Sequence, residues 1–380
     1  MHVIQKKIPK IDTLSEQLAL IALSKPDLLL MFASPEFFAV QELYDLLRDA
    51  LPDTALMGCS TAGGISLDGM EENSCLLTGV RFDDTKLIQA STRLSGMTDS
   101  FTAGVRLGQQ LVAEDLRAIL LFSPGVAVNG SALVEGLSRI VGAEVIVTGG
   151  LAGDNGAFKR TFTLGPEGVR DDHVVALGLS GNALLISHGS AGGWVPFGPA
   201  RKVTRYEHNT LFELDGEPAL DVYKRYLGEH ANRLPASGLL FPFAMQGQDQ
   251  SESGLIRTIL GIDEAAGSLI LAGDIDPQGY LKLMHASTDR LVNGAKAAAK
   301  ATEEMLPLSG PKLAILVSCV GRKLVMGTRI NEEIQAVMEI LGPSTKVTGF
   351  YSYGEISPSH PGSTCQLHNQ TMTITCLAEG

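Results

Sequence analysis

The feature of this chain that most limits its fold is an internal repeat. The segments LIQAS, AILLFS and VIVTGG (residues 87–150) recur in the same order as LMHAS, AILVS and KVTGF (residues 283–350). In both copies the first two segments start 31 positions apart. Each copy predicts strand, helix, strand, helix, strand, and a partial third copy runs from DLLLMFAS to ALMGCSTAGG near the N-terminus. Duplication of this kind places a cleft between equivalent halves.

The segments between the glycine-rich turns predict a mixed α/β fold. Short continuous apolar runs such as AILLF (118–122) are typical of strands buried on both faces, and helical patterns such as 131–141 separate them. TMTIT (371–375) alternates with a period of two, which indicates a hairpin strand. We therefore predict two related mixed-sheet α/β halves with a ligand cleft at the glycine-rich strand ends. The predicted domains are residues 1–213 and 214–380.

Charge and cysteine content exclude several classes of protein. The net charge of −12 argues against a nucleic-acid partner, because binding to phosphates requires clustered Lys and Arg. No apolar run reaches the roughly 20 residues of a membrane helix. The start, MHVIQKKIPK, lacks the apolar stretch of a signal peptide. Five cysteines, an odd number, fit reduced thiols better than a disulfide framework. We expect a cytoplasmic protein.

Three glycine-rich turns at equivalent positions predict a pocket. They are GCSTAGGI (58–65), GGLAGDNG (149–156) and GFYSYGEI (349–356). In open α/β sheets ligands bind beyond the carboxyl ends of the strands, and glycine lets the backbone approach a ligand. None of the three has the P-loop pattern. Plain tight turns are the alternative, but their threefold recurrence favours a pocket.

Polar side chains near the third turn suggest how a ligand is recognised. Tyr351, Tyr353 and Glu355 alternate, so they share one direction in an extended segment. We expect Arg322 and Asn369 near the same mouth, and exposed turn residues are the alternative. The predicted ligand pocket comprises Cys59, Ser60, Thr61, Gly150, Asp154, Cys319, Arg322, Tyr351, Tyr353, Glu355 and Asn369.

Cys59 and Cys319 are the candidate nucleophiles. Both end predicted strands, and Arg322 follows Cys319 closely enough to lower the pKa of its thiol. A nucleophilic cysteine needs a base, and no histidine is recognisable as that base from the sequence. We expect buried, inert thiols and no catalytic residues. A cysteine-dependent enzyme that uses Cys319 or Cys59 remains an alternative.

The eight histidines form no metal-binding motif. Non-covalent haem, however, requires only one axial histidine in an apolar pocket. His188 follows the strand-like run ALLIS, and His368 lies on a strand after the third turn. Both are candidate haem ligands, and an ordinary hydrogen-bonded histidine is the alternative for each.

Six motifs, in order, resemble the FIST family of bacterial sensory domains. They are GCSTAGGI, GWVPFGPARKVT, LFELDGEPALDVYKRYLG, SCVGRKLVMGTR, GFYSYGEISP and LHNQTMTIT. The resemblance spans nearly the whole chain. It implies a non-enzymatic input module of signal transduction that binds small ligands such as amino acids.

The chain is also similar to a stand-alone subgroup of FIST proteins. That similarity implies binding of haem, sensing of nitric oxide and regulation of a separate histidine kinase or cyclic-di-GMP enzyme. A homodimer is also considered. A sensor of an amino-acid-like ligand without haem is the alternative, with Glu355 and Arg322 holding the charged ends of the ligand.

Overall fold

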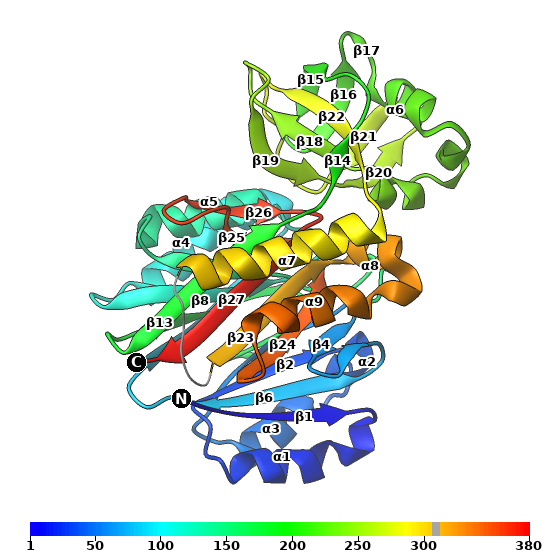
Figure 1. Ribbon diagram of the computed structural model, residues 1–380. Helices are drawn as coiled ribbons and strands as arrows, with labels where there is room; N and C mark the ends of the chain where they lie inside the picture. Colours follow the sequence, from blue (N-terminus) through cyan, green and yellow to red (C-terminus); the bar gives the residue numbers. More distant parts are fainter. Residues whose placement is uncertain (306–311) are drawn as a thin grey trace.

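The computed structural model describes residues 1–305 and 312–380. Within them, three α/β modules share an inner core and carry one inserted domain (Figure 1). The modules comprise residues 2–81, residues 86–180, and residues 184–191 with 288–379, and the inserted domain comprises residues 195–285. The predicted mixed α/β class is confirmed. No helix in this described part is both long and apolar enough to cross a membrane.

All three modules repeat one order of elements. The first contains β1 (His2–Ile8), η1 (Ile11–Thr13), α1 (Leu14–Ala22), β2 (Leu28–Ala33), α2 (Pro35–Phe38), α3 (Leu43–Ala50), β3 (Ala55–Ser60), β4 (Gly64–Ser66), β5 (Gly69–Glu71) and β6 (Cys75–Arg81). The second contains β7 (Lys86–Arg93), η2 (Met97–Asp99), α4 (Ser100–Leu111), β8 (Leu116–Ser123), α5 (Gly130–Val141), β9 (Ile146–Leu151), β10 (Thr163–Gly165), β11 (Gly168–Arg170) and β12 (His173–Ser180). The third contains β13 (Leu184–Ala191), α7 (Thr288–Met305), β23 (Lys312–Cys319), α8 (Val320–Met326), η5 (Gly327–Arg329), α9 (Asn331–Leu341), β24 (Thr345–Ser352), β25 (Gly354–Pro358), β26 (Cys365–His368) and β27 (Met372–Glu379).

The inserted domain interrupts the third module between β13 and α7. It contains β14 (Val195–Pro196), β15 (Arg201–Glu207), β16 (Thr210–Leu214), β17 (Glu217–Pro218), α6 (Ala219–Leu227), η3 (Gly228–Arg233), η4 (Ala236–Leu240), β18 (Phe243–Gln246), β19 (Glu252–Arg257), β20 (Ile259–Asp263), β21 (Ser268–Leu271) and β22 (Tyr280–His285). The predicted repeat is wrong at one segment. The first three residues of LMHAS lie in β22 of the inserted domain, and the strand equivalent to β7 is β13. The N-terminal copy is complete rather than partial.

Strands pair identically in the three modules. The first strand runs antiparallel to the last, as in β1–β6, β7–β12 and β13–β27. The last strand then pairs with the second strand, in the antiparallel sense. The second strand runs parallel to the third, as in β2–β3, β8–β9 and β23–β24. Each module therefore presents the edge of its third strand to a neighbour.

The short hairpin of each module fills that edge in another module. Hairpin β10–β11 of the second module extends the first sheet beyond β3. Hairpin β25–β26 of the third module extends the second sheet beyond β9. Hairpin β4–β5 of the first module extends the third sheet beyond β24. The exchange closes a ring, so each sheet is complete only with a neighbour in place.

Three glycines allow the third strands to lie close to their parallel neighbours. Gly58, Gly149 and Gly349 occupy the same position in β3, β9 and β24. A Cβ atom on each would lie 2.1, 2.0 and 1.9 Å, respectively, from the carbonyl oxygen of the residue opposite on the parallel strand. These glycines were interpreted as sites of ligand approach. In the structure a neighbouring strand makes that approach instead.

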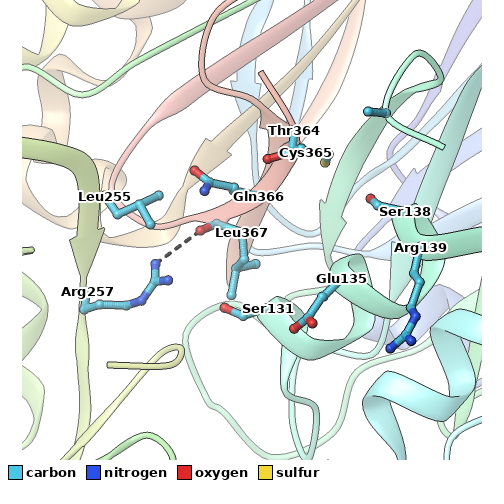
Figure 2. Close-up of a pocket in the computed structure, with 11 residues that line it drawn as sticks. Ser131, Glu135, Ser138, Arg139, Leu255, Arg257, Thr364, Cys365, Gln366 and Leu367 are labelled. Carbon is cyan, nitrogen blue, oxygen red and sulfur yellow. Dashed lines mark hydrogen bonds between the residues drawn. The ribbon is translucent and has the colours of Figure 1, made fainter. Parts of the chain in front are cut away.

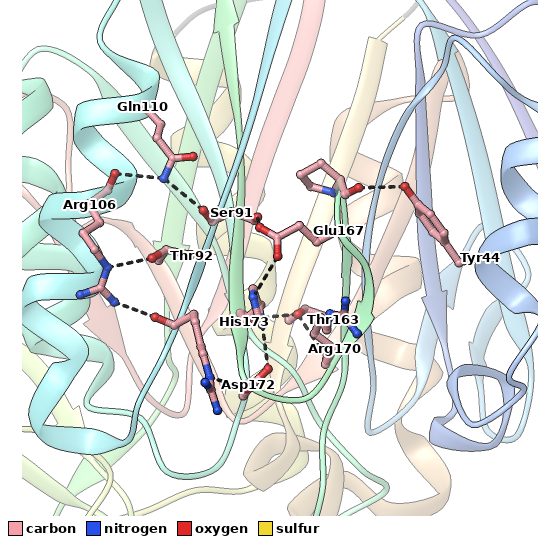
Figure 3. A network of polar contacts seen from close by, with 12 residues as sticks. Tyr44, Ser91, Thr92, Arg106, Gln110, Thr163, Glu167, Arg170, Asp172 and His173 are labelled. Carbon is pink, nitrogen blue, oxygen red and sulfur yellow. Dashed lines mark hydrogen bonds and ion pairs between the residues drawn. The ribbon is translucent and has the colours of Figure 1, made fainter.

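The exchanged hairpin β10–β11 is held from both sides (Figure 3). From the first module, the Tyr44 hydroxyl donates to the carbonyl oxygen of Pro166 over 2.8 Å. From the second module, the Ser91 hydroxyl donates to the Glu167 carboxylate over 2.6 Å, and Nε2 of His173 lies 3.1 Å from the same carboxylate. The hairpin therefore links the two modules through side chains as well as through strand pairing.

Continuous apolar strands follow from burial on both faces. In β2, Phe32 faces the inner core and Met31 faces the covering helices. In the inner core, the rings of Phe32, Phe122 and Phe350 meet with centroids 4.8 to 5.6 Å apart. Helices α1 and α3 cover the outer face of the first sheet, α4 and α5 the second, and α7 and α9 the third (Figure 1).

The glycine requirement can be tested within one motif. Gly58→Ala should lower the free energy of unfolding by about 3 kcal/mol, because the new methyl group overlaps a backbone carbonyl that cannot move alone. Gly64→Ala is the matched control, since the nearest atom to its Cβ would be 3.9 Å away. Equal unfolding midpoints of the two variants in urea would contradict this account of the motif.

Candidate functional site

Residues of the first two glycine turns lie in the junction between modules. The Ser60 hydroxyl donates to the carbonyl oxygen of Gly153 and accepts from the backbone N–H of Phe162, both over 2.8 Å. Three other predicted pocket residues of these turns, Cys59, Thr61 and Gly150, are also buried. Ser60 thus connects neighbouring modules, and its hydroxyl is already bonded to protein partners.

Tyr353 and Asp154, both predicted pocket residues, come from different modules and lie in contact. The Tyr353 hydroxyl donates to the Asp154 carboxylate and accepts from the backbone N–H of Asp154 and Gly156 over 3.1 and 3.0 Å. The same carboxylate accepts from the N–H groups of Phe158 and Lys159 over 2.8 and 2.7 Å. Burial raises the pKa of Tyr353 most, and the hydrogen bond to Asp154 raises it further. The pair thus orders the turn 154–160.

The Tyr353 ring also lines a cavity of about 200 Å³ between the second module and the inserted domain, called here the apolar cavity. Its wall is formed by the loop after β8, by Phe158 and by β20 and β21. The cavity lies at the carboxyl ends of β8 and β9, which is where the sequence predicted a cleft.

Arg322 and Tyr351 lie in the core and not at a pocket mouth. Nη2 of Arg322 is 2.6 Å from the carboxylate of Glu333, and both side chains are fully buried. The Tyr351 hydroxyl donates to the same carboxylate over 2.6 Å, and that of Ser318 donates over 3.0 Å. Burial, together with Glu333, raises the pKa of Tyr351. The Arg322 guanidinium, which was expected to bind a ligand, therefore forms an ion pair with Glu333 inside the protein.

Glu355 and Asn369 form a second buried polar region. The Glu355 carboxylate accepts from Ser352 Oγ over 2.6 Å and from the N–H and hydroxyl of Thr371 over 3.1 and 3.0 Å. Burial outweighs these bonds and raises the pKa of Glu355 to about 7. The buried Asn369 amide has no hydrogen-bond partner among the described residues. The pKa of the Cys319 thiol is raised, mainly by burial and secondly by the negative charge of Glu355.

The two candidate haem ligands are buried but do not share a site. Nε2 of His368 lies 2.9 Å from the carbonyl oxygen of Ser357, and burial lowers the pKa of His368 to about 4. Burial also lowers the pKa of His188, whose Nδ1 has no partner in the described part of the chain. Neither imidazole lines the apolar cavity or the larger cavity described next.

A cavity of about 490 Å³, called here the polar cavity, lies where α5, β26 and β19 meet (Figure 2). The second module contributes one face of α5, the third module contributes its hairpin, and the inserted domain contributes β19. The lining residues are Ser131, Glu135, Ser138, Arg139, Ala143, Leu255, Arg257, Thr364, Cys365, Gln366 and Leu367. The modules and the inserted domain therefore both contribute to the wall of the polar cavity.

Arg257 is the most unusual group in this wall. Its side chain is 4% exposed, yet its hydrogen bonds go to backbone carbonyls, with Nε donating to Asp274 over 3.0 Å and Nη1 to Leu367 over 3.2 Å. The Asp274 carboxylate accepts instead from Nδ2 of Asn129, over 2.9 Å. Burial lowers the pKa of Arg257 to about 10, so the guanidinium is charged at neutral pH. A buried guanidinium with carbonyl partners favours an incoming anion.

Helix α5 supplies the complementary groups. Ser131, Glu135 and Ser138 lie on one helical face, since their spacings of four and three residues match the helical repeat. The hydroxyls of Ser131 and Ser138 are buried and have no partner within the described residues. Asn129 caps the helix by accepting from the N–H of Ala132 over 3.1 Å. The cavity thus brings together a carboxylate, two guanidinium groups and two hydroxyls.

Sequence reasoning missed all the charged groups of the polar cavity. Glu135 and Arg139 look like ordinary exposed residues of an amphipathic helix, and their common environment depends on a domain inserted far along the chain. Arg257 carried a usable signal, because a charged residue stands between the apolar Ile256 and Ile259 near the end of a strand. No such signal marked Glu333 as the partner of Arg322.

The structure is that of a modular α/β protein with a cavity between its modules and an inserted domain. The FIST N domain model matches residues 27–217 and the FIST C domain model matches residues 219–358. The chain therefore belongs to the FIST family, whose domains are sensory domains of signal transduction that bind small ligands.

Other comparisons add little. No curated protein matches the chain in sequence. A crystal structure of cyanuric acid hydrolase from A. caulinodans is similar at 11% identity and a TM-score of 0.39, covering 99% of this chain and 98% of that chain. Likeness at this level does not bear on activity.

The assignment of Arg322 to the core can be tested at its partner. Glu333→Gln should lower the free energy of unfolding by about 3–5 kcal/mol, because it leaves a buried guanidinium uncompensated. Glu332→Gln is the matched control, since the adjacent Glu332 pairs with Arg329 at the surface and its loss should change little. If both variants unfold at the same urea concentration, the buried pair does not have the role described.

Proposed function

We propose that this protein is a cytoplasmic sensor of a small molecule carrying a carboxylate and an ammonium group, held in the polar cavity. The observation that carries the proposal is Arg257, a buried guanidinium whose partners are carbonyls. A ligand carboxylate would accept from Nη2 of Arg257, because Nε and Nη1 already donate to backbone carbonyls. Glu135 would accept from the ammonium group, and the α5 hydroxyls would orient the rest. An amino acid or a close analogue has this chemistry.

Ligand binding would change the arrangement of the inserted domain relative to the modules. A ligand in the polar cavity touches both parts, since Arg257 belongs to the inserted domain and Glu135 to the second module. It therefore binds more tightly to the arrangement in which both contacts are made, and this difference shifts the population. Gly193, with a φ of 95°, lies at the entry to the inserted domain and suits a joint that changes its angle.

The output would be regulation of a separate partner. A histidine kinase or a cyclic-di-GMP enzyme is the partner class implied by the family resemblance, and a homodimer would be one way to present a paired surface to it. These partners stay proposals, as does the cytoplasmic location.

Haem with nitric oxide sensing is the second candidate function. One observation favours it, namely that His188 has a buried Nδ1 without a partner among the described residues. The surroundings do not fit the group, because neither His188 nor His368 faces the polar or the apolar cavity. Haem binding therefore remains a prediction from the resemblance, and no mechanistic step is derived from it.

A cysteine-dependent enzyme is the third candidate, and it lacks support at its nucleophile. Burial raises the pKa of both Cys59 and Cys319, which keeps these thiols protonated at neutral pH. After burial, the Glu355 carboxylate raises the pKa of Cys319 most and disfavours a thiolate further, and the opposite effect of Arg322 is smaller.

The role of Arg257 can be tested with the twenty L-amino acids, each compared with the amine that lacks its carboxylate. At least one amino acid should raise the melting temperature, and its amine should not. At 100 times the Kd, the gain in stability is about 2.7 kcal/mol. Arg257→Gln and Glu135→Gln should each weaken binding, the former by about 100-fold. Arg117→Gln, an exposed arginine on β8, is the control. Binding unchanged in Arg257→Gln would overturn the proposal.

The haem candidate makes a different prediction. If it is correct, haem added to the purified protein gives a stoichiometric Soret band that is lost in His188→Ala and retained in His208→Ala, an exposed histidine of the inserted domain. Our account expects no stoichiometric band. A band that depends on His188 would replace the amino-acid proposal with a haem sensor.

A further inference from the structure

The apolar cavity differs in chemistry from the polar cavity beside it. Every side chain that lines the apolar cavity is uncharged, whereas Glu135, Arg139 and Arg257 line the polar one. Its own amide groups are already used. Asn129 donates to Asp274 and caps α5, and Nδ2 of Asn209 donates to the carbonyl of Leu271 over 2.8 Å. A ligand here would gain from apolar contact and not from ion pairing.

Two aromatic rings form one wall of this cavity. Phe158 stacks on Tyr353 with ring centroids 4.1 Å apart and an angle of 15° between the planes. Backbone bonds fix both rings, since the Tyr353 hydroxyl and the Asp154 carboxylate each accept from the N–H of Phe158. The stack is therefore held before any ligand arrives.

The backbone around the cavity is strained at two points. Phe158 has a φ of 53° and Ala127, in the loop after β8, has a φ of 56°. Side chains other than glycine rarely adopt this region, and strained residues gather at sites that clamp ligands. Both residues line the apolar cavity, and they come from different turns. The strain shapes the wall where the two aromatic rings are presented.

We infer that the apolar cavity is a second binding site, which takes a neutral molecule with a single flat ring. At about 200 Å³ the cavity exceeds the roughly 150 Å³ that suffices for benzene in an apolar protein cavity. The ring packs against Phe158 and Tyr353, and Leu151 and Ile270 close the sides. A charged ring is disfavoured, because its charge would lose water and find no partner.

The site lies next to the contact that joins the two parts of the molecule. Asn129 lines the apolar cavity and bonds to Asp274, whose carbonyl accepts from Arg257 in the polar cavity. A ligand in the apolar cavity therefore touches the same junction as a ligand in the polar one. The inference does not depend on what the polar cavity binds.

Three probes with one ring type test the proposal by isothermal titration calorimetry. They are benzyl alcohol, benzoate and benzylammonium. Benzyl alcohol should bind at one site, about tenfold or more tightly than either charged probe. The benzoate titration is repeated in Arg257→Gln, which removes the anion site of the polar cavity, so that any remaining binding of benzoate belongs to another site.

Variants that fill the cavity locate the site. Ala272→Phe and Val128→Phe each place a ring in the apolar cavity and should abolish binding of benzyl alcohol, and either one suffices if the other fails to fold. Leu23→Phe is the matched control, because Leu23 is 80% exposed on the first module. No binding of benzyl alcohol, binding that survives the filled variants, or equal binding of benzoate in Arg257→Gln would each overturn the inference.

Discussion

The structure depends on the close approach of backbone to backbone at Gly58, Gly149 and Gly349. At each position the strand lies between a parallel neighbour of its own module and a hairpin from another module. A side chain there would meet the carbonyl of the parallel strand at about 2 Å. Because the hairpins are exchanged in a ring, none of the three sheets is complete in isolation. The three modules therefore form one body, and the FIST N and FIST C matches do not divide at a sheet edge.

This ring also determines where ligands can bind. The inner faces of the sheets are filled by Phe32, Phe122 and Phe350, and the edges of the third strands are covered by the exchanged hairpins. Open space is left where the inserted domain rests against the second and third modules. Both the polar and the apolar cavity lie along that boundary. A ligand there would contact the inserted domain and the modules at once, as the proposed sensory role requires.

Local patterns predicted much of this fold and little of the site. Apolar runs and helical faces identified the repeating strands, because those patterns depend on burial alone. The exchange of hairpins was not predictable, since which edge a short strand joins is decided between modules. The glycine turns were interpreted as ligand loops because glycine suits any close neighbour, whether ligand or strand. Arg322 was placed at a pocket because nothing in its own segment reveals Glu333, and the inserted position of Arg257 concealed its environment.

The central claim is that Arg257 holds a ligand between the inserted domain and the modules. The most direct measurement is a crystal structure of the full chain grown with a mixture of L-amino acids. The account predicts density for one amino acid in the polar cavity, with its carboxylate on the Arg257 guanidinium and its ammonium group facing Glu135. Density for an amino acid elsewhere, with the Arg257 guanidinium still bonded to the carbonyls of Ile256, Asp274 and Leu367 and to no ligand, would contradict it.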